Sequence, residues 1–404
     1  MSAKKQYKQT ELGLIPEDWE VKKISKFTQT TAGGTPSTQK NEYWNGDIKW
    51  MNSGELNLKK VFNVENKITE LGLKNSSTKL IPVKCILIGL AGQGKTRGTV
   101  AMNMVELCTN QSIAAIYPND SFISEFLYYN LDNRYAELRR LSTGDGGRGG
   151  LNLKLINSLK IPLPPLPEQK AIADCLSTWD VAIEKQSALI NALTDRKKAL
   201  MQQLLTGKKR LPGFSGEWKE VKLGEIIIDY KEKPNDNNNY EILTSSKNGL
   251  MKQTDYYGDN RITNRTDADY NVIPNGFITY RSRSDDGLFT FNLNDLGVIG
   301  LISGYYPVFS FAKSNTQFLL SFLNYFKSKL IKYAIGTSQL VLSINALKEA
   351  KFKLPSLEEQ TAIAEILTIA DRELQLQKEK LAQLQTQKKG LMQVLLTGKK
   401  RLIN

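Results

Sequence analysis

The chain contains no histidine among its 404 residues. Imidazole is needed for Ser-His-Asp and Cys-His catalysis, for His-ligated zinc and for most proton transfer near neutral pH. The absence of histidine therefore excludes these classes of enzyme before any motif is considered.

Cysteine and long apolar runs are also scarce. The three cysteines, Cys85, Cys108 and Cys175, lack the spacing of a metal site, so we expect reduced, mostly buried thiols and no bound metal. No apolar run approaches the roughly 18 residues that span a bilayer, and the start of the chain lacks the apolar core of a signal peptide. These features predict a soluble, cytoplasmic protein.

Basic residues exceed acidic ones, 55 against 41, which leaves a net charge of +14. Such an excess favours a polyanionic partner, nucleic acid first, although a protein that is simply basic has the same composition. The length suggests two or three domains, at roughly 150 residues each.

An internal repeat organises the chain. Residues 160–211 recur as residues 351–402 at a constant offset of 191, and both copies end in LLTGKKRL. Glu168-Gln169 returns as Glu359-Gln360, for example. The order along the chain is therefore globular, helix, globular, helix.

Each repeated segment is predicted to be a long helix. Prolines precede the first one, none occurs inside it from Glu168 to Thr206, and Gly207 and Gly398 are candidate C-caps. Both segments carry a 3-4 heptad stripe, which continues in each copy through a lysine, Lys197 or Lys388. The predicted helix-pairing residues are Ile172, Leu176, Trp179, Ile183, Gln186, Ile190 and Leu193 in the first copy, and Ile363, Leu367, Leu374, Gln377, Leu381 and Leu384 in the second.

A stripe of this length requires a partner helix, and the other copy is the nearest one. We therefore predict an antiparallel intramolecular coiled coil, in which the polar stripe residues fix the register. The predicted fold class is α+β: two β-rich domains joined by two long antiparallel coiled-coil helices with pseudo-twofold symmetry. Two similar domains held apart in this way suit two separated half-sites on DNA.

A motif of the P-loop type, GxxxxGKT, occurs at residues 89–96. Phosphate binding there would need a following helix, but the residues after Thr96 read as a returning strand. We therefore interpret the segment as a glycine-rich hairpin that presents Gln93, Lys95 and Arg97 to DNA, or as a plain surface hairpin.

Further candidate DNA contacts follow from the same reasoning. Arg148 lies in a glycine-rich run that lets the backbone approach a phosphate, although a simple connector has the same composition. Arg281 and Arg283 follow the strand of the second half that corresponds to the one before the hairpin. Because alternate residues of a strand point the same way, both are expected to face one groove. The basic clusters at the helix ends, which include Arg210 and Arg401, complement the helix dipoles.

The chain resembles the specificity subunits of Type I restriction-modification systems over essentially its whole length. The residues that carry the resemblance are GGTPSTQKNEYWNGDIKWMNSGEL (33–56), the segments IPLPPLPEQKAIADCL and KLPSLEEQTAIAEIL before and into the two helices, and both LLTGKKRL ends. The resemblance implies target-recognition domains at 1–160 and 212–350, and conserved spacer helices at 161–211 and 351–404.

This resemblance further implies a non-catalytic subunit that reads a bipartite DNA target with a fixed spacer. Two methyltransferase subunits are expected to dock on it and to supply S-adenosylmethionine. Restriction subunits, where present, would bring ATP and Mg²⁺. Two alternatives stay open: a coiled-coil adaptor with non-specific DNA binding, and a P-loop NTPase that acts on DNA.

Overall fold

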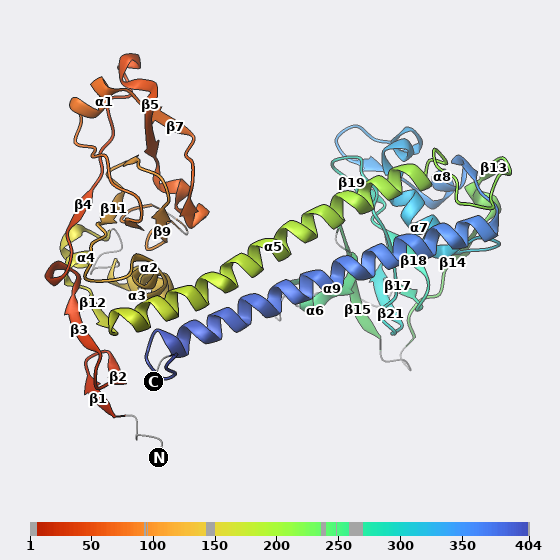
Figure 1. The fold of residues 1–404 in the computed structure, drawn as a ribbon. Helices are drawn as coiled ribbons and strands as arrows, with labels where there is room; N and C mark the ends of the chain where they lie inside the picture. The colour runs from red at the N-terminus through yellow and green to blue at the C-terminus, as the bar shows by residue number, and fades with distance from the viewer. Residues whose placement is uncertain are drawn as a thin grey trace. The chain divides into compact units, whose positions relative to one another are not determined.

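The computed structural model describes residues 6–92, 94, 96–142, 150–235, 240–247, 249–257 and 270–402. The chain divides into two compact units. Unit 1 comprises Met1–Ser187 and Glu379–Asn404, and unit 2 comprises Ala188–Lys378. Each unit therefore contains one globular domain and part of both long helices (Figure 1). Within the described ranges, no helix is long and apolar enough to cross a membrane.

The domain of unit 1 is built around a five-stranded sheet in the order β4-β11-β8-β9-β6, beside a three-stranded sheet in the order β10-β5-β7. Two further strand pairs, β1 with β2 and β3 with β12, lie near the chain start and the first long helix. The strands are β1 (Tyr7–Thr10), β2 (Gly13–Pro16), β3 (Glu20–Lys23), β4 (Thr30–Ala32), β5 (Trp44–Met51), β6 (Lys60–Val61), β7 (Asn66–Ile68), β8 (Ile86–Gly89), β9 (Val100–Asn103), β10 (Cys108–Thr109), β11 (Ile113–Ile116) and β12 (Lys160–Leu163).

The five-stranded sheet is buried on both faces. Side chains of β8 and of Cys85 just before it alternate between two apolar clusters: Ile86 and Ile88 face one, whereas Cys85 and Leu87 face the other. The first cluster includes α2 and extends onto the long helices, so the domain core is continuous with them. The short helices of this domain are α1 (Glu70–Lys74), α2 (Ser124–Asn133), α3 (Tyr135–Leu141) and α4 (Leu153–Ser158).

Unit 2 holds two four-stranded sheets, in the orders β14-β22-β18-β20 and β16-β15-β21-β17. Its main core packs the aromatic side chains of β18, β20, β22 and α7 against both long helices. The elements are β13 (Lys219–Lys222), β14 (Ile227–Tyr230), β15 (Glu241–Ser246), β16 (Gly249–Lys252), α6 (Gln253–Tyr257), β17 (Tyr270–Ile273), β18 (Ile278–Tyr280), β19 (Arg283–Ser284), β20 (Phe291–Leu293), β21 (Gly300–Ser303), β22 (Val308–Phe311), α7 (Thr316–Tyr325), β23 (Leu340–Val341), α8 (Ile344–Lys348) and β24 (Lys351–Leu354).

The long helices are α5 (Leu166–Leu204) and α9 (Leu357–Leu395), whose ends keep the 191-residue offset of the sequence repeat. The predicted start at Glu168 was wrong by two residues. Pro167 lies inside the first turn of the helix. Backbone N–H groups there have no acceptor within the helix, so a proline, which lacks this group, is tolerated. Both predicted C-caps are confirmed, because Gly207 and Gly398 adopt φ of 68° and 70° after the helix ends.

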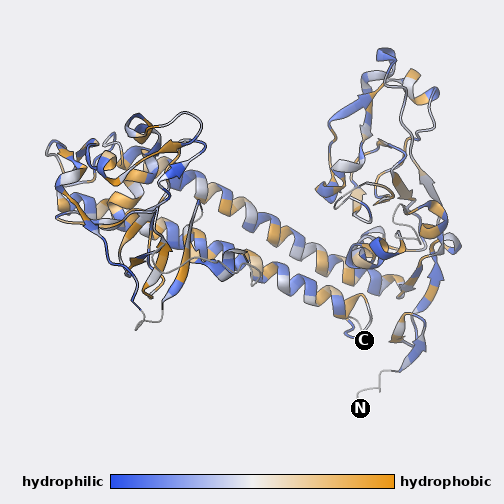
Figure 2. Cartoon of the chain, turned by 180° about the vertical axis from the view of Figure 1, so that it is seen from behind, coloured by the Kyte–Doolittle hydropathy of each residue, from blue (hydrophilic) through white to orange (hydrophobic). Residues whose placement is uncertain are grey.

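The predicted stripe lies on the less exposed side of both helices. All predicted helix-pairing residues are buried or partly buried, and Figure 2 shows hydrophobic and hydrophilic bands alternating along both helices. Ion pairs fix the register: Lys388 with Asp180 in unit 1, and Lys197 with Asp371 in unit 2. In each unit, residue numbers rise along one helix as they fall along the other, so the helices are antiparallel. The stripe lysines thus set the register by pairing with carboxylates of the other helix.

Two helical segments of the domains are divided. The segment 124–141 divides into α2 and α3 at Arg134, whose guanidinium group bonds to Glu137 and to the carbonyl of Lys160. Helix α7 ends at Tyr325, and a 3₁₀ helix, Lys327–Tyr333, follows it. In the first case, a side-chain contact to distant backbone outweighs local helix propensity.

Candidate nucleic-acid interface

The arginines predicted in the second half meet in one hollow of unit 2. Arg281 directly follows β18, and Arg283 begins β19, while the intervening Ser282 is buried. Arg281 and Arg283 are exposed and line the same hollow, which has a volume of about 620 Å³. Both arginines therefore face the same hollow, and their contact with one groove of DNA stays a prediction.

Two tyrosines of the β21–β22 turn orient these arginines. The Nε–H of Arg281 donates a hydrogen bond to the Tyr306 hydroxyl at 3.0 Å. The guanidinium carbon of Arg283 lies 5.1 Å from the ring centroid of Tyr305. Tyr305 is 67% exposed, so it offers a flat face for stacking as well as a support for Arg283.

Charges of both signs line this hollow. Lys247 pairs with Asp286 at 2.6 Å, and this contact, with hydrogen bonds from Ser284 and the Leu288 backbone, holds the pKa of Asp286 well below its usual range. Asp285 accepts a hydrogen bond from Gln339 at 2.9 Å. Three cations thus face two carboxylates, and the arginine and glutamine side chains are types that hydrogen-bond to guanine and adenine edges.

The sequence did not reveal Lys247, Tyr305, Tyr306 or Gln339 as members of this site. They come from the β15–β16 turn, the β21–β22 turn and the loop before β23, so only tertiary packing brings them together. The exposed Tyr-Tyr pair in a turn was the one available signal, since large aromatic side chains in turns often bind ligands.

In unit 1, the glycine-rich segment forms a hairpin between β8 and β9. These strands pair antiparallel, and the Gly98 N–H donates to the Gly89 carbonyl at 2.9 Å. The predicted returning strand is confirmed: residues after Thr96 lead into β9, and no helix starts behind the motif in the described residues of this hairpin. The geometry required for a phosphate-binding P-loop is therefore missing at residues 96–103.

Arg97 is partly buried in this hairpin. One guanidinium nitrogen, Nη1, lies 3.4 Å from the Ser142 hydroxyl, and Arg139 of α3 donates a hydrogen bond to the Gly94 carbonyl. Arg97 and Arg139 therefore lie at the same hairpin. Arg139 was not predicted from the sequence as a DNA-contacting residue. Gln93, Lys95 and Arg148 lie outside the described residues.

We expect Lys95→Ala to leave ATP binding at background level, as in the unchanged chain, because β9 rather than a helix follows the motif. The measurement is equilibrium binding of a fluorescent ATP analogue. ATP binding by the unchanged chain that this substitution abolishes would restore the NTPase alternative.

The basic clusters at the helix ends have a structural role that the sequence did not reveal. Arg401, after α9, binds the carboxylate of Glu168 at the start of α5, at 2.5 and 2.6 Å. Arg210, after α5, binds Glu359 at the start of α9, at 2.6 Å through two nitrogens. Glu168 and Glu359 are almost completely buried. The two contacts are related by the 191-residue offset, as expected for pseudo-twofold symmetry.

The glutamines of the same repeated pairs attach each domain to the helices. The Gln169 side chain accepts from the Ile123 N–H before α2 and donates to the Pro164 carbonyl, at 2.9 and 2.8 Å. Gln360 makes the equivalent bonds to Asn315 before α7 and to Pro355, both at 3.0 Å. The repeated Glu-Gln pair therefore connects the long helices with each other and with the domain beside them.

The cysteines behave as buried apolar residues in two of three cases. Burial raises the pKa of Cys85 to about 12 and that of Cys108 to about 11, so both are thiols at neutral pH. Over the described ranges, no group of three potential metal ligands comes together.

Comparison with known proteins places both halves of the chain in one family. Residues 16–195 and 215–386 each match the family described as Type I restriction modification DNA specificity domain. The type I restriction enzyme MjaVIII specificity subunit of Methanocaldococcus jannaschii is 26% identical over 420 residues, covering 96% of this chain and 95% of that protein. The EcoR124I/EcoR124II specificity subunit of Escherichia coli is 30% identical over 179 residues, or 44% of this chain and 43% of that protein.

Solved structures show the same fold. The S subunit of a Type I restriction-modification system from M. genitalium superposes with a TM-score of 0.58 at 16% identity, covering 93% of this chain and 96% of that one. A chain of the type I restriction-modification system, from a structural study of its assembly and conformational transition, gives a TM-score of 0.59 at 19% identity. It covers 96% of this chain and 99% of that one.

Proposed function

Since the chain belongs to the Type I restriction modification DNA specificity family, we propose that each of its two domains reads one half of a bipartite DNA target. The chain is a Type I restriction-modification specificity subunit, which recognises its DNA target through two specificity domains. The proposal rests on this double match, because each matching range holds one β-rich domain and part of the long helix that follows it. Two half-sites separated by a fixed spacer fit such a repeat.

The hollow of Arg281 and Arg283 contains side chains that can hydrogen-bond to the bases of one half-site. A guanidinium group can bond to two acceptors of guanine at once, and Gln339 can bond to adenine in the same way. In unit 1 the hairpin between β8 and β9, with Arg97 and Arg139, supports the same role. Arginine and lysine side chains around both sites would also contact phosphates and position the duplex.

The partners would dock on the long helices. Val181, Leu189, Ile369 and Leu376 are 44–66% exposed on α5 and α9, although they are apolar. Exposed apolar positions on a helix favour packing by further helices. We assign them to two methyltransferase subunits. S-adenosylmethionine would bind to those subunits, and this chain would contribute recognition rather than catalysis. Restriction subunits would add ATP and Mg²⁺.

Arg283→Ala is expected to weaken discrimination at one base pair of one half-site by about 1–3 kcal/mol and to leave the other half-site intact. The reason is that Arg283 lies in the domain of unit 2 alone. The measurement is equilibrium binding of the reconstituted complex to duplexes that vary one base pair at a time.

Arg283→Lys is the matched control for this experiment. Lysine keeps the positive charge but lacks the planar fork of donors, so overall affinity should be retained while discrimination falls. Equal losses at both half-sites would contradict separate reading by the two domains. DNA binding without sequence preference by the unchanged complex would favour the alternative of a coiled-coil adaptor with non-specific DNA binding.

A further inference from the structure

Two tryptophans occupy equivalent positions in the two units. Trp19 directly precedes β3 and Trp218 directly precedes β13. Each ring lies against the glycine that ends a long helix. A Cβ atom placed on Gly398 would lie 3.4 Å from the Trp19 ring, and one placed on Gly207 would lie 3.4 Å from the Trp218 ring.

In unit 1 this position is covered by the start of the chain. The β1–β2 hairpin brings Pro16 against Gly398, and the Tyr7 hydroxyl donates to the Gly398 carbonyl at 3.1 Å. Asp18 then pairs with Arg401 at 2.8 and 2.9 Å. Trp19 is 0% exposed, belongs to the same apolar cluster as Ile15 of this segment, and its Nε1–H donates to Glu168 at 3.0 Å.

In unit 2 the equivalent position is open. Trp218 is only partly buried, and among the described residues nothing accepts a hydrogen bond from its buried Nε1–H. Where Arg401 binds a second carboxylate, Arg210 bonds to the Gly216 carbonyl at 2.7 Å. Trp218, Thr206 and Lys353 line both of two hollows, of about 410 and 330 Å³.

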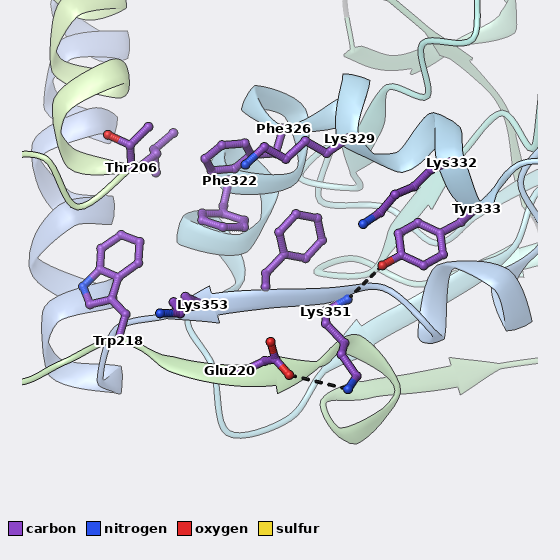
Figure 3. Close-up of a pocket in the computed structure, with 12 residues that line it drawn as sticks. Thr206, Trp218, Glu220, Phe322, Phe326, Lys329, Lys332, Tyr333, Lys351 and Lys353 are labelled. Carbon is purple, nitrogen blue, oxygen red and sulfur yellow. Dashed lines mark hydrogen bonds and ion pairs between the residues drawn. The ribbon is translucent and has the colours of Figure 1, made fainter.

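The larger hollow combines an aromatic lining with positive charge (Figure 3). Lysine side chains outnumber the single carboxylate, Glu220, which lies 3.5 Å from Lys351. The Lys329 ammonium lies 4.4 Å from the Phe326 ring centroid. The lining residues of this kind are Lys329, Lys332, Lys351, Lys353, Trp218, Phe322, Phe326, Tyr333 and Phe352.

We propose that the hollow at Trp218 binds an acidic, proline-containing peptide segment of a partner protein, in the way that residues 6–18 cover Trp19 in unit 1. The segment would place an apolar ring on Trp218 and carboxylates toward the lysines. A hollow of about 410 Å³ has the size of a small-ligand site and holds a few side chains rather than a duplex. This role is independent of DNA reading.

The probe is a fluorescein-labelled peptide with the sequence of residues 6–18, in which one lysine, two glutamates and one aspartate leave a net charge of −2. Binding to the full chain is followed by fluorescence anisotropy. We expect Lys329→Glu combined with Lys353→Glu to weaken binding at least tenfold. Both lysines are exposed, so the fold is retained, and circular dichroism checks this.

Lys198→Glu is the control, because it makes the same charge change at an exposed position on α5. It should alter peptide affinity by less than twofold, whereas Asp18→Asn in the peptide should weaken binding about fivefold. Equal affinities for the double variant and the control would overturn the proposal. Displacement of the peptide by a short DNA duplex would also overturn it and assign the hollow to phosphate binding.

Discussion

Arg401→Gln is expected to lower the free energy of unfolding of unit 1 by about 3–5 kcal/mol, the usual effect of removing one partner of a buried ion pair. The carboxylate of Glu168 is 0% exposed, so without Arg401 a buried charge would keep only the Trp19 Nε1–H as a side-chain donor among the residues that the structure describes. The same change releases Asp18 and weakens the attachment of the N-terminal hairpin.

Hydrogen–deuterium exchange is the appropriate measurement, because a chain with two units does not unfold in a single step. Protection should fall in β3, β12 and the first turns of α5, while unit 2 serves as an internal reference. Lys400→Gln, at an exposed neighbouring position, should have no effect. Adding Glu168→Gln to Arg401→Gln should restore part of the loss, since the buried charge is then removed. Unchanged protection in the single variant would contradict the structural role of this pair.

Insertion of one heptad into both long helices is expected to lengthen the spacer of the DNA target by about three base pairs. The insertions belong between Asp180 and Lys197 on α5 and between Asp371 and Lys388 on α9, so that both register-fixing ion pairs survive. Seven residues add about 10 Å to a helix, and each base pair occupies about 3.4 Å. The half-site bases should stay unchanged, because the domain residues are untouched.

The measurement is to determine which DNA motif becomes methylated in cells that carry the lengthened chain and its methyltransferase partner. A variant with substitutions at exposed positions of the same segments, without a change in length, is the control and should keep the original spacer. New half-site bases with the original spacer would contradict the view that the helices set the distance.

The long helices could be predicted from sequence because their signal is local and occurs twice. A 3.5-residue apolar period needs only neighbouring residues to be visible, and the offset of 191 aligned the two copies. The ends were placed within two residues. The lysines that fix the register could also be recognised in the sequence, because Lys197 and Lys388 interrupt the apolar stripe at equivalent positions.

The contacts that use these residues could not be predicted in the same way. Nothing in the sequence indicates that Glu168 pairs with Arg401, because the two are 233 positions apart and both fit exposed helix ends. The hollow around Arg283 depends on three turns that converge only after the sheets form. Spacing reveals which residues share an element, whereas convergence of separate loops is decided by tertiary packing.

Reading of a bipartite DNA target by the two domains of this chain is tested most directly by mapping N6-methyladenine across the genome by single-molecule sequencing. Cells carrying the methyltransferase partner are compared with and without this gene. We expect a methylated motif in two parts around a fixed, unspecified spacer, present only with the gene. The absence of any new motif, with the partner expressed and the complex formed, would contradict it.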